Sequence, residues 1–261
     1  MMKKWLVPVV AGMGLLLTGC VKGQTQTVDP KIGTVIEKSQ QATQKIKSGE
    51  AKIATRTIAN QQTISGTISG KFVSKPLLMK VKLANGDSRN RIRYYIKSNM
   101  IYSKPNHQWI KQKVNSKSPI VANLKAQMTA KSGQKGLGML GHHLKKAKTQ
   151  ANYRLSYHGI GKLGSHTAKQ LILAESGNSP AAKQMVNHLK ITKFSYLYVV
   201  NKTDYLPRKL AITMGYTMGS SKKAVTEKLM GNYQYLNQVK KFTIPKSVKT
   251  SAEWASTSTL M

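Results

Sequence analysis

From residue 50 to residue 114 the chain alternates apolar with polar or basic side chains, which is the two-residue period of a half-buried β-strand. The pattern occurs in the segments AKIATRTI, TISGTISGKF, LLMKVKLA, RIRYYIKSNMIY and HQWIKQKV. Polar turns separate these segments, and Asn85-Gly86 is a strong hairpin signal between two of them. This part of the chain is therefore predicted to form a meander of antiparallel strands with one apolar face.

Apolar residues at helical spacing precede and interrupt these strands. Asp29-Pro30 is a typical helix start, and the sequence KSGE predicts the end of that first helix. Residues 119–149 are predicted to form two short helices around a flexible glycine-rich joint, SGQKGLGMLG. This insertion is either a lid over the sheet or an ordinary connection. Ser179-Pro180 predicts the start of another short helix.

Strand-like patterns return after residue 151 in the segments NYRLSYHGI, HTAKQLILAES, ITKFSYLYVV, LPRKLAITMGYTM and AVTEKLMGNYQYLNQV. Strands on both sides of a helical insertion predict an α+β fold with a large antiparallel sheet. No linker divides this region, so residues 30–250 are predicted to form a single domain. Residues 251–261 are predicted to be a loose C-terminal tail.

The first 19 residues have the pattern of a secretory signal peptide. A basic start precedes an apolar run from Trp5 to Leu17, which is shorter than the ~20 residues of a membrane-spanning helix. Leu17, Thr18, Gly19 and Cys20 resemble the lipobox of bacterial lipoproteins. That resemblance implies a diacylglycerol on the Cys20 sulfur, further acyl chains such as palmitate, and cleavage before Cys20. Residues 20–29 then form a polar tether on the outer face of the cell membrane.

Cys20 is the single cysteine of the chain, so an internal disulfide and a cysteine-based metal site are excluded. The alternative to lipidation is an unused thiol behind a transmembrane anchor. The charged start, the short apolar run and the small residues before Cys20 all favour the lipobox.

The charge of the chain is strongly basic, with 43 Lys and Arg against 8 Asp and Glu and a net charge of +35. Such a field attracts polyanions and anionic surfaces over a Debye length of ~8–10 Å. Most of the basic residues are lysines, whereas bidentate recognition of phosphates and bases favours arginine. The lysines are also spread along the whole chain. The charge therefore favours anionic membranes and envelope polymers as partners over specific nucleic-acid binding.

Residues that could carry out chemistry are few. No two carboxylates form a close pair in the sequence, and the adjacent His142 and His143 cannot share one helix face. The chain has no HExxH, P-loop or GxSxG motif. We therefore predict a non-catalytic protein without a metal or a cofactor, apart from the acyl groups on Cys20.

Three further segments carry a resemblance to a known family: Y-x₆-W-I-K from Tyr102 to Lys111, YLYVVNKTDYLPRKL at 196–210, and FTIPKSV at 242–248. Together with the lipobox, they resemble a family of Gram-positive lipoproteins that is similar to the LolA/LppX-type lipoprotein carriers. Asn201 stands where an acidic residue is common in that pattern. The resemblance implies a strongly curved antiparallel sheet, a half-open barrel, with helices packed on its concave side and an apolar cavity between the two.

On that fold, apolar residues of one strand and of the helical insertion are candidates for the cavity walls, and the alternative is that they form an ordinary core. They are Leu77, Met79, Val81, Leu83, Val121, Leu124, Met128, Leu137, Met139 and Leu140. The sequence thus predicts a membrane-anchored module that binds a lipid or another hydrophobic ligand. The alternative is a cationic surface protein that binds teichoic acid, anionic lipid or glycans without a cavity ligand.

Overall fold

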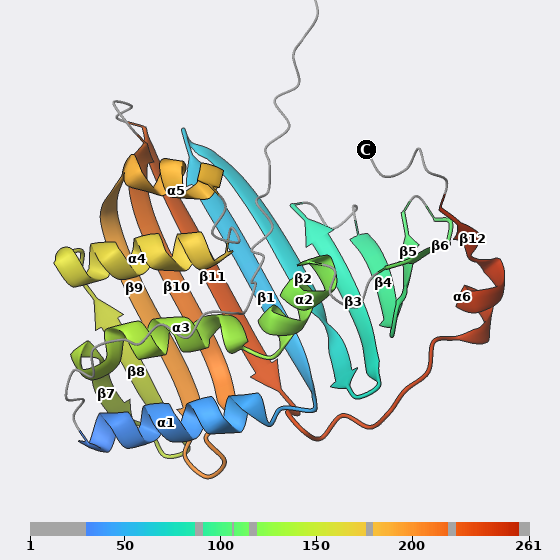
Figure 1. Ribbon diagram of the computed structural model, residues 1–261, viewed down its shortest axis with the longest axis horizontal. Helices are drawn as coiled ribbons and strands as arrows, with labels where there is room; N and C mark the ends of the chain where they lie inside the picture. Colours follow the sequence, from blue (N-terminus) through green and yellow to red (C-terminus); the bar gives the residue numbers. More distant parts are fainter. Residues whose placement is uncertain are drawn as a thin grey trace, which may run out of the picture.

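The computed structural model describes residues 30–86, 91–105, 107–114, 119–175, 180–218 and 223–255 (Figure 1). The segment that contains the signal peptide, Cys20 and the tether lies outside these residues, so its predicted roles stay predictions. The described helices are α1 Pro30–Gln44, α2 Pro119–Met128, α3 Lys131–Leu140, α4 Lys162–Glu175, α5 Pro180–Asn187 and α6 Lys246–Ser251. The strands are β1 Ser48–Ala59, β2 Gln62–Ser74, β3 Leu77–Asn85, β4 Arg91–Lys97, β5 Met100–Lys104, β6 Ile110–Lys113, β7 Lys145–Lys148, β8 Asn152–His158, β9 Leu189–Asn201, β10 Pro207–Met218, β11 Ala224–Gln234 and β12 Glu253–Trp254.

All described strands belong to one 12-stranded sheet with the order β12-β6-β5-β4-β3-β2-β1-β11-β10-β9-β8-β7. Every neighbouring pair is antiparallel except β12 and β6, which are parallel. The two end strands do not meet, so the sheet is open and is not a closed barrel. The predicted α+β class, with a large antiparallel sheet, is confirmed.

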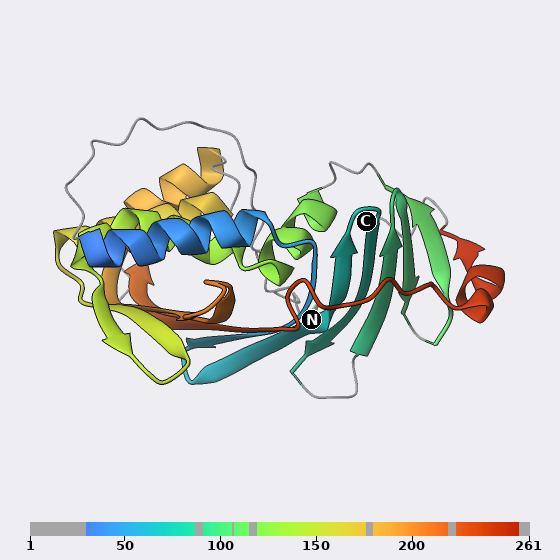
Figure 2. The ribbon, with the colours of Figure 1, turned by 90° about the horizontal axis from the view of Figure 1, so that it is seen from below.

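The sheet is strongly curved, and α1 to α5 lie on its concave side (Figure 2). Helices α1, α3, α4 and α5 cover the half formed by β7 to β11, whereas α2 lies over β1 and β2 (Figure 1). None of the described helices is long and apolar enough to cross a membrane. Below, the inner face is the side under α1 to α5, and the outer face is the opposite side.

Alternation along the strands separates the two faces. On the inner face, Leu155, Tyr198 and Leu210 lie in one row across neighbouring strands, and all three are fully buried. Ile53 continues this row on β1 beyond Gly231 of β11. These side chains and the apolar faces of the helices form the main hydrophobic cluster. Its apolar surface, removed from water, is the chief source of stability.

The segment 196–210 of the family resemblance runs from the end of β9 through a tight turn into β10. The Asn201 side-chain oxygen accepts hydrogen bonds from the backbone N–H groups of Thr203 at 2.8 Å and Asp204 at 3.2 Å. Asp204 in turn accepts from the N–H of Leu206 at 2.9 Å. Both are local side-chain caps of a tight turn, a role that Asn and Asp share. The replacement of an acidic residue by Asn201 therefore leaves the turn intact.

A second, smaller cluster brings the other two family segments together on the outer face. Phe242, Ile244 and Val248 pack with Leu78, Tyr95, Tyr102 and Trp109. The segment after β11 thus crosses to the far end of the sheet, where β12 pairs with β6 (Figure 2). Residues 253–254 were predicted to belong to a loose tail, but their pairing with β6 extends the fold past residue 250.

The predictions of local structure are also wrong for α4 and β7. The segment HTAKQLILAES was predicted to be a strand, but its residues 166–175 lie in α4. Thr167, Ala168 and Leu171 are its buried positions, and their spacing of three to four residues is that of a helix face. The end of the insertion, residues 145–148, was predicted to be helical, but it is the edge strand β7.

Candidate functional site

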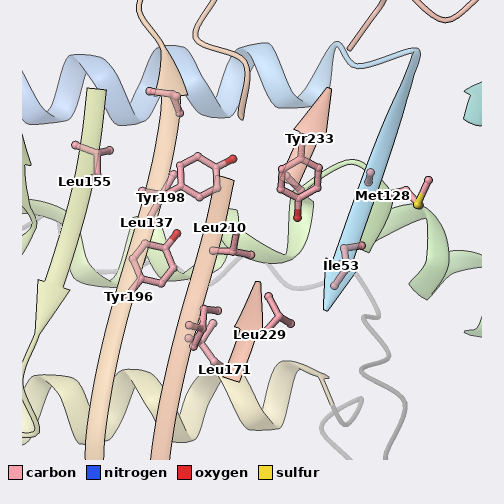
Figure 3. Packing of buried hydrophobic residues seen from close by; sticks show 14 of the residues in the cluster. Ile53, Met128, Leu137, Leu155, Leu171, Tyr196, Tyr198, Leu210, Leu229 and Tyr233 are labelled. Carbon is pink, nitrogen blue, oxygen red and sulfur yellow. The ribbon is translucent and has the colours of Figure 1, made fainter. Parts of the chain in front are cut away.

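The candidate site lies where α3 packs on the inner face of the sheet (Figure 3). The glycine-rich segment SGQKGLGMLG was predicted to be a flexible joint, but it forms most of α3. A Cβ added at Gly133 would lie 2.8 Å from the ring of Tyr198, and one added at Gly136 would lie 2.5 Å from the ring of Tyr196. These glycines are therefore needed for close packing of the helix on two tyrosine rings.

The break in the insertion falls between α2 and α3. The Thr129 hydroxyl donates a hydrogen bond to the Lys125 carbonyl at 2.8 Å, and the next residue, Ala130, has the left-handed backbone angle φ 59°. Left-handed backbone ends a helix because its hydrogen-bond pattern cannot continue. The two helices therefore meet at a defined corner.

A pair of variants in α3 tests the packing on the tyrosine rings. Gly136→Ala is expected to lower the free energy of unfolding by about 1–3 kcal/mol, because its methyl group overlaps the Tyr196 ring. Gly138→Ala is the control, because its nearest neighbour is the Gln40 amide nitrogen at 3.9 Å. It is expected to raise stability by up to about 1 kcal/mol through better helix propensity. Urea unfolding measures both, and equal effects of the same sign would contradict this packing.

Polar groups form a buried cluster within this apolar interface. The Tyr196 hydroxyl donates a hydrogen bond to the Gly133 carbonyl at 2.6 Å. The Gln134 side-chain nitrogen donates to the Tyr198 hydroxyl at 2.7 Å and to the Thr43 hydroxyl of α1 at 3.0 Å. Tyr233 of β11 is also buried nearby (Figure 3). The cluster thus joins α1, α3 and the sheet at one place.

Burial changes the acidity of these tyrosines. Removal from water raises the pKa of Tyr198 to about 12, although neighbouring hydrogen-bonding side chains, among them the Gln134 amide, lower it. Burial also raises the pKa of Tyr196 and of Tyr233 well above the ordinary value. All three phenols are therefore neutral at physiological pH, and they can donate and accept hydrogen bonds but not carry charge.

One acceptor of this cluster is not satisfied within the described part of the chain. The Gln134 side-chain oxygen is buried and has no hydrogen-bond partner there. A buried polar atom without a partner costs about 1–3 kcal/mol, so each such atom in a native fold needs an explanation. A donor on a bound molecule would satisfy this oxygen.

The ten predicted cavity residues lie on β3 and on the helices α2 and α3. Buried in the main cluster are Met79, Val81, Val121, Met128, Leu137 and Leu140. Leu77, Leu83 and Leu124 are partly buried against the cluster, and Met139 is partly exposed on α3. In this arrangement their side chains pack as a core. That they also contact a ligand stays a prediction.

The buried polar cluster itself was missed in the sequence. Its signal was the spacing of Tyr196 and Tyr198, which places both rings on one face of a strand, together with Gly133 and Gly136 at helical spacing. His142 and His143 lie side by side after α3, with ring centres 3.8 Å apart. The described residues contain no group of three or more potential metal ligands.

Comparison with known proteins gives similar folds at low sequence identity, whereas no curated protein matches the chain in sequence. The chain is similar to the lipoprotein LppX of Mycobacterium tuberculosis, with 11% identity, a TM-score of 0.45, and 82% of this chain and 100% of LppX covered. LprF of Mycobacterium bovis has 10% identity and a TM-score of 0.38, with 85% and 99% of the two chains covered. A LolA superfamily protein of Nitrosomonas europaea has 9% identity and a TM-score of 0.28, with 82% and 95% covered.

LppX and the LolA superfamily are the group that the sequence resemblance named, whereas an origin in Gram-positive bacteria stays a prediction. A family model, described as a family of unknown function, matches residues 31–253. The match includes the described helices and strands almost from the start of α1 to β12. The chain therefore belongs to the family of unknown function DUF6612.

Proposed function

We propose that this protein is a lipid-anchored extracytoplasmic binding module without catalytic activity. Its ligand is a lipid or another molecule with a long apolar part and a polar end. The ligand occupies the interface between the inner face of the sheet and the helices α2 and α3. The observation that carries the proposal is the polar cluster in the middle of this apolar interface.

The chemistry of the cluster fits such a ligand. Binding sites for small apolar molecules are lined mostly by apolar side chains, with a few polar groups that fix the orientation of the ligand. Here the hydroxyls of Tyr196 and Tyr198 and the amide of Gln134 are those groups, among side chains such as Leu137 and Leu210. A hydroxyl or amide at the polar end of the ligand would donate to the unsatisfied Gln134 oxygen.

Entry of the ligand requires the helices to move, and two features support such a movement. The corner at Ala130 separates α2 from α3, so α3 can tilt without unfolding its neighbour. Glycine in a helix costs about 0.5–1 kcal/mol relative to alanine, so Gly133, Gly136 and Gly138 lower the intrinsic stability of α3. In this proposal α2 and α3 act as the lid, and the structure corresponds to the closed state.

The location of the protein is part of the same proposal. The lipobox and the acyl chains on Cys20 would hold the domain at the outer face of the cell membrane. One acyl chain gives marginal attachment, and the two or three of a lipoprotein give a stable one. A lipid ligand would then be available within reach of the tether.

The proposal is tested with the chain from residue 21 onward. After purification without detergent, we expect organic extraction and mass spectrometry to recover a lipid in roughly equimolar amount. A fluorescent fatty-alcohol probe, whose hydroxyl can donate to the Gln134 oxygen, should bind the delipidated protein. Gln134→Leu is expected to weaken probe binding about fivefold, because it removes one hydrogen-bonding group worth ~1 kcal/mol.

Gln44→Leu is the matched control, because Gln44 is exposed at the end of α1. It should leave probe binding unchanged. Circular dichroism confirms that each variant is folded. A folded wild-type protein that yields no lipid and binds no probe would refute the proposal.

A further inference from the structure

The lysines that are scattered in the sequence are brought together on the outer face of the sheet. Cross-strand pairing places Lys71 directly opposite Lys80, with Glu50 on the other side of Lys71. In the next row of the same face, Ser69 lies between Lys52 and Lys82. Paired residues are ~5 Å apart and rows are ~7 Å apart, so four ammonium groups share one small area.

The row that contains Lys52 and Lys82 continues across the sheet in both directions. Arg93 and Lys104 follow on β4 and β5. On the other side, Asn232 of β11 is followed by Lys209 of β10. Positive charge therefore extends beyond the four lysines along the outer face, and it would raise the local concentration of anions.

The four lysines line an open depression of about 540 Å³, together with Ser69, Asn232 and Gln234. A second depression of about 390 Å³ adjoins it and shares Glu50 and Lys71. The segment after β11 forms the wall of the second depression, including Phe242. The outer face thus has a recess with cationic, hydroxyl and amide groups on its walls.

Aromatic rings hold two of the ammonium groups in place. The Lys71 ammonium lies 4.8 Å from the centre of the Phe242 ring, and the Lys80 ammonium lies 5.9 Å from that of Tyr95. Cation–π contacts restrict the motion of a long side chain but leave the charge unneutralised. Both lysines therefore keep their charge available at the recess.

Counter-charge is scarce at this recess. None of the four lysines forms an ion pair with a residue that the structure describes, and Glu50 is the one carboxylate among the lining residues. Like charges directly opposite each other on a sheet destabilise it. An anion with several oxygens would offset this repulsion and accept hydrogen bonds from the ammonium, hydroxyl and amide groups.

We propose that this recess, the lysine recess, binds a phosphate group, carried either by a lipid head group or by a soluble molecule. The site faces away from the lid helices, and it shares no residue with the proposed ligand site. It therefore does not depend on the proposed function. Lysines bind such groups as point charges, so binding should be strongly reduced by salt.

The test uses the full chain in a neutral detergent and measures acetylation of each lysine by mass spectrometry. One arm adds glycerol 1-phosphate, and the other adds phosphatidylglycerol to the micelles. We expect acetylation of Lys52, Lys71, Lys80 and Lys82 to slow at least threefold at low salt. Lys135 of α3 and Lys183 of α5, both exposed on the helix side, serve as controls within the same molecule and should react unchanged.

Protection in both arms supports the site and assigns it to the phosphate group itself. Protection only by phosphatidylglycerol supports a lipid head group, and protection only by glycerol 1-phosphate supports a soluble ligand. The proposal is overturned by equal protection of Lys135 and Lys183, which would indicate diffuse charge, or by no protection in either arm. A second test compares two double variants of equal net charge. One carries Lys52→Gln and Lys82→Gln, and the other carries Lys135→Gln and Lys183→Gln. In the first double variant, protection of Lys71 and Lys80 should require a ligand concentration about tenfold higher. The second double variant should leave this concentration unchanged.

Discussion

Leu210→Ala is expected to lower the free energy of unfolding by about 2–5 kcal/mol, the usual cost of removing a fully buried leucine. Leu210 lies in the first half of β10 and is 0% exposed. Its side chain reaches to 3.2 Å from the position of a Cβ at Gly133, so it also supports α3. The truncation would leave a cavity between the sheet and α3. Urea unfolding followed by circular dichroism measures the loss.

Met230→Ala is the matched control for this prediction. Met230 lies on the neighbouring strand β11 but on the outer face, and it is 45% exposed. We expect its truncation to cost less than about 1 kcal/mol, because little new surface reaches water and no cavity forms. Equal losses for the two variants would show that Leu210 does not occupy a packed interior.

The second large effect is expected at alkaline pH. The pKa of Tyr198 is raised by burial from 10.0 to about 12, so the unfolded chain releases this proton at a lower pH than the folded protein does. The stabilising contribution is complete below pH 10 and is lost as the pH rises toward 12. Each pKa unit corresponds to about 1.4 kcal/mol, so Tyr198 alone accounts for a loss of about 3 kcal/mol. Tyr196 and Tyr233 change stability in the same direction.

The measurement compares urea unfolding of wild type and Tyr198→Phe between pH 9 and 11.5. The difference in stability between the two should shrink as the pH rises, because phenylalanine has no proton to lose. Tyr235→Phe is the control, because Tyr235 is 55% exposed, and it should keep the wild-type pH dependence. Absorbance of ionised Tyr198 in the folded protein below pH 10.5 would contradict the burial argument.

The sequence was most informative where structure is local. Alternation and turn residues predicted the strands β1 to β6, which follow each other in the sheet in the order of the chain. The same signals failed at α3, because glycines indicate flexibility unless their packing partner is known. Tyr196 and Tyr198, the partners of these glycines, lie about 60 residues later, and only the folded sheet brings them under α3.

The lysine recess could not be predicted for a related reason. Alternation does indicate that Lys80 and Lys82 share one face of a strand. That this face also receives Lys52 and Asn232 depends on the pairing of β1 with both β2 and β11. β1 and β11 are far apart in the sequence, so no short-range signal specifies that they pair. The lysines were therefore interpreted as spread along the chain, although the sheet gathers several of them.

The open sheet has a consequence for the behaviour of the protein at high concentration. An unpaired edge strand can add strands from another copy and begin aggregation, which closed barrels avoid. The edge strand β7 has the sequence KKAK, and three of its four residues are lysines, which repel a second edge of the same kind. At the other edge, β12 has two residues and offers little to pair with. Charge and short length thus protect the edges that an open sheet leaves exposed.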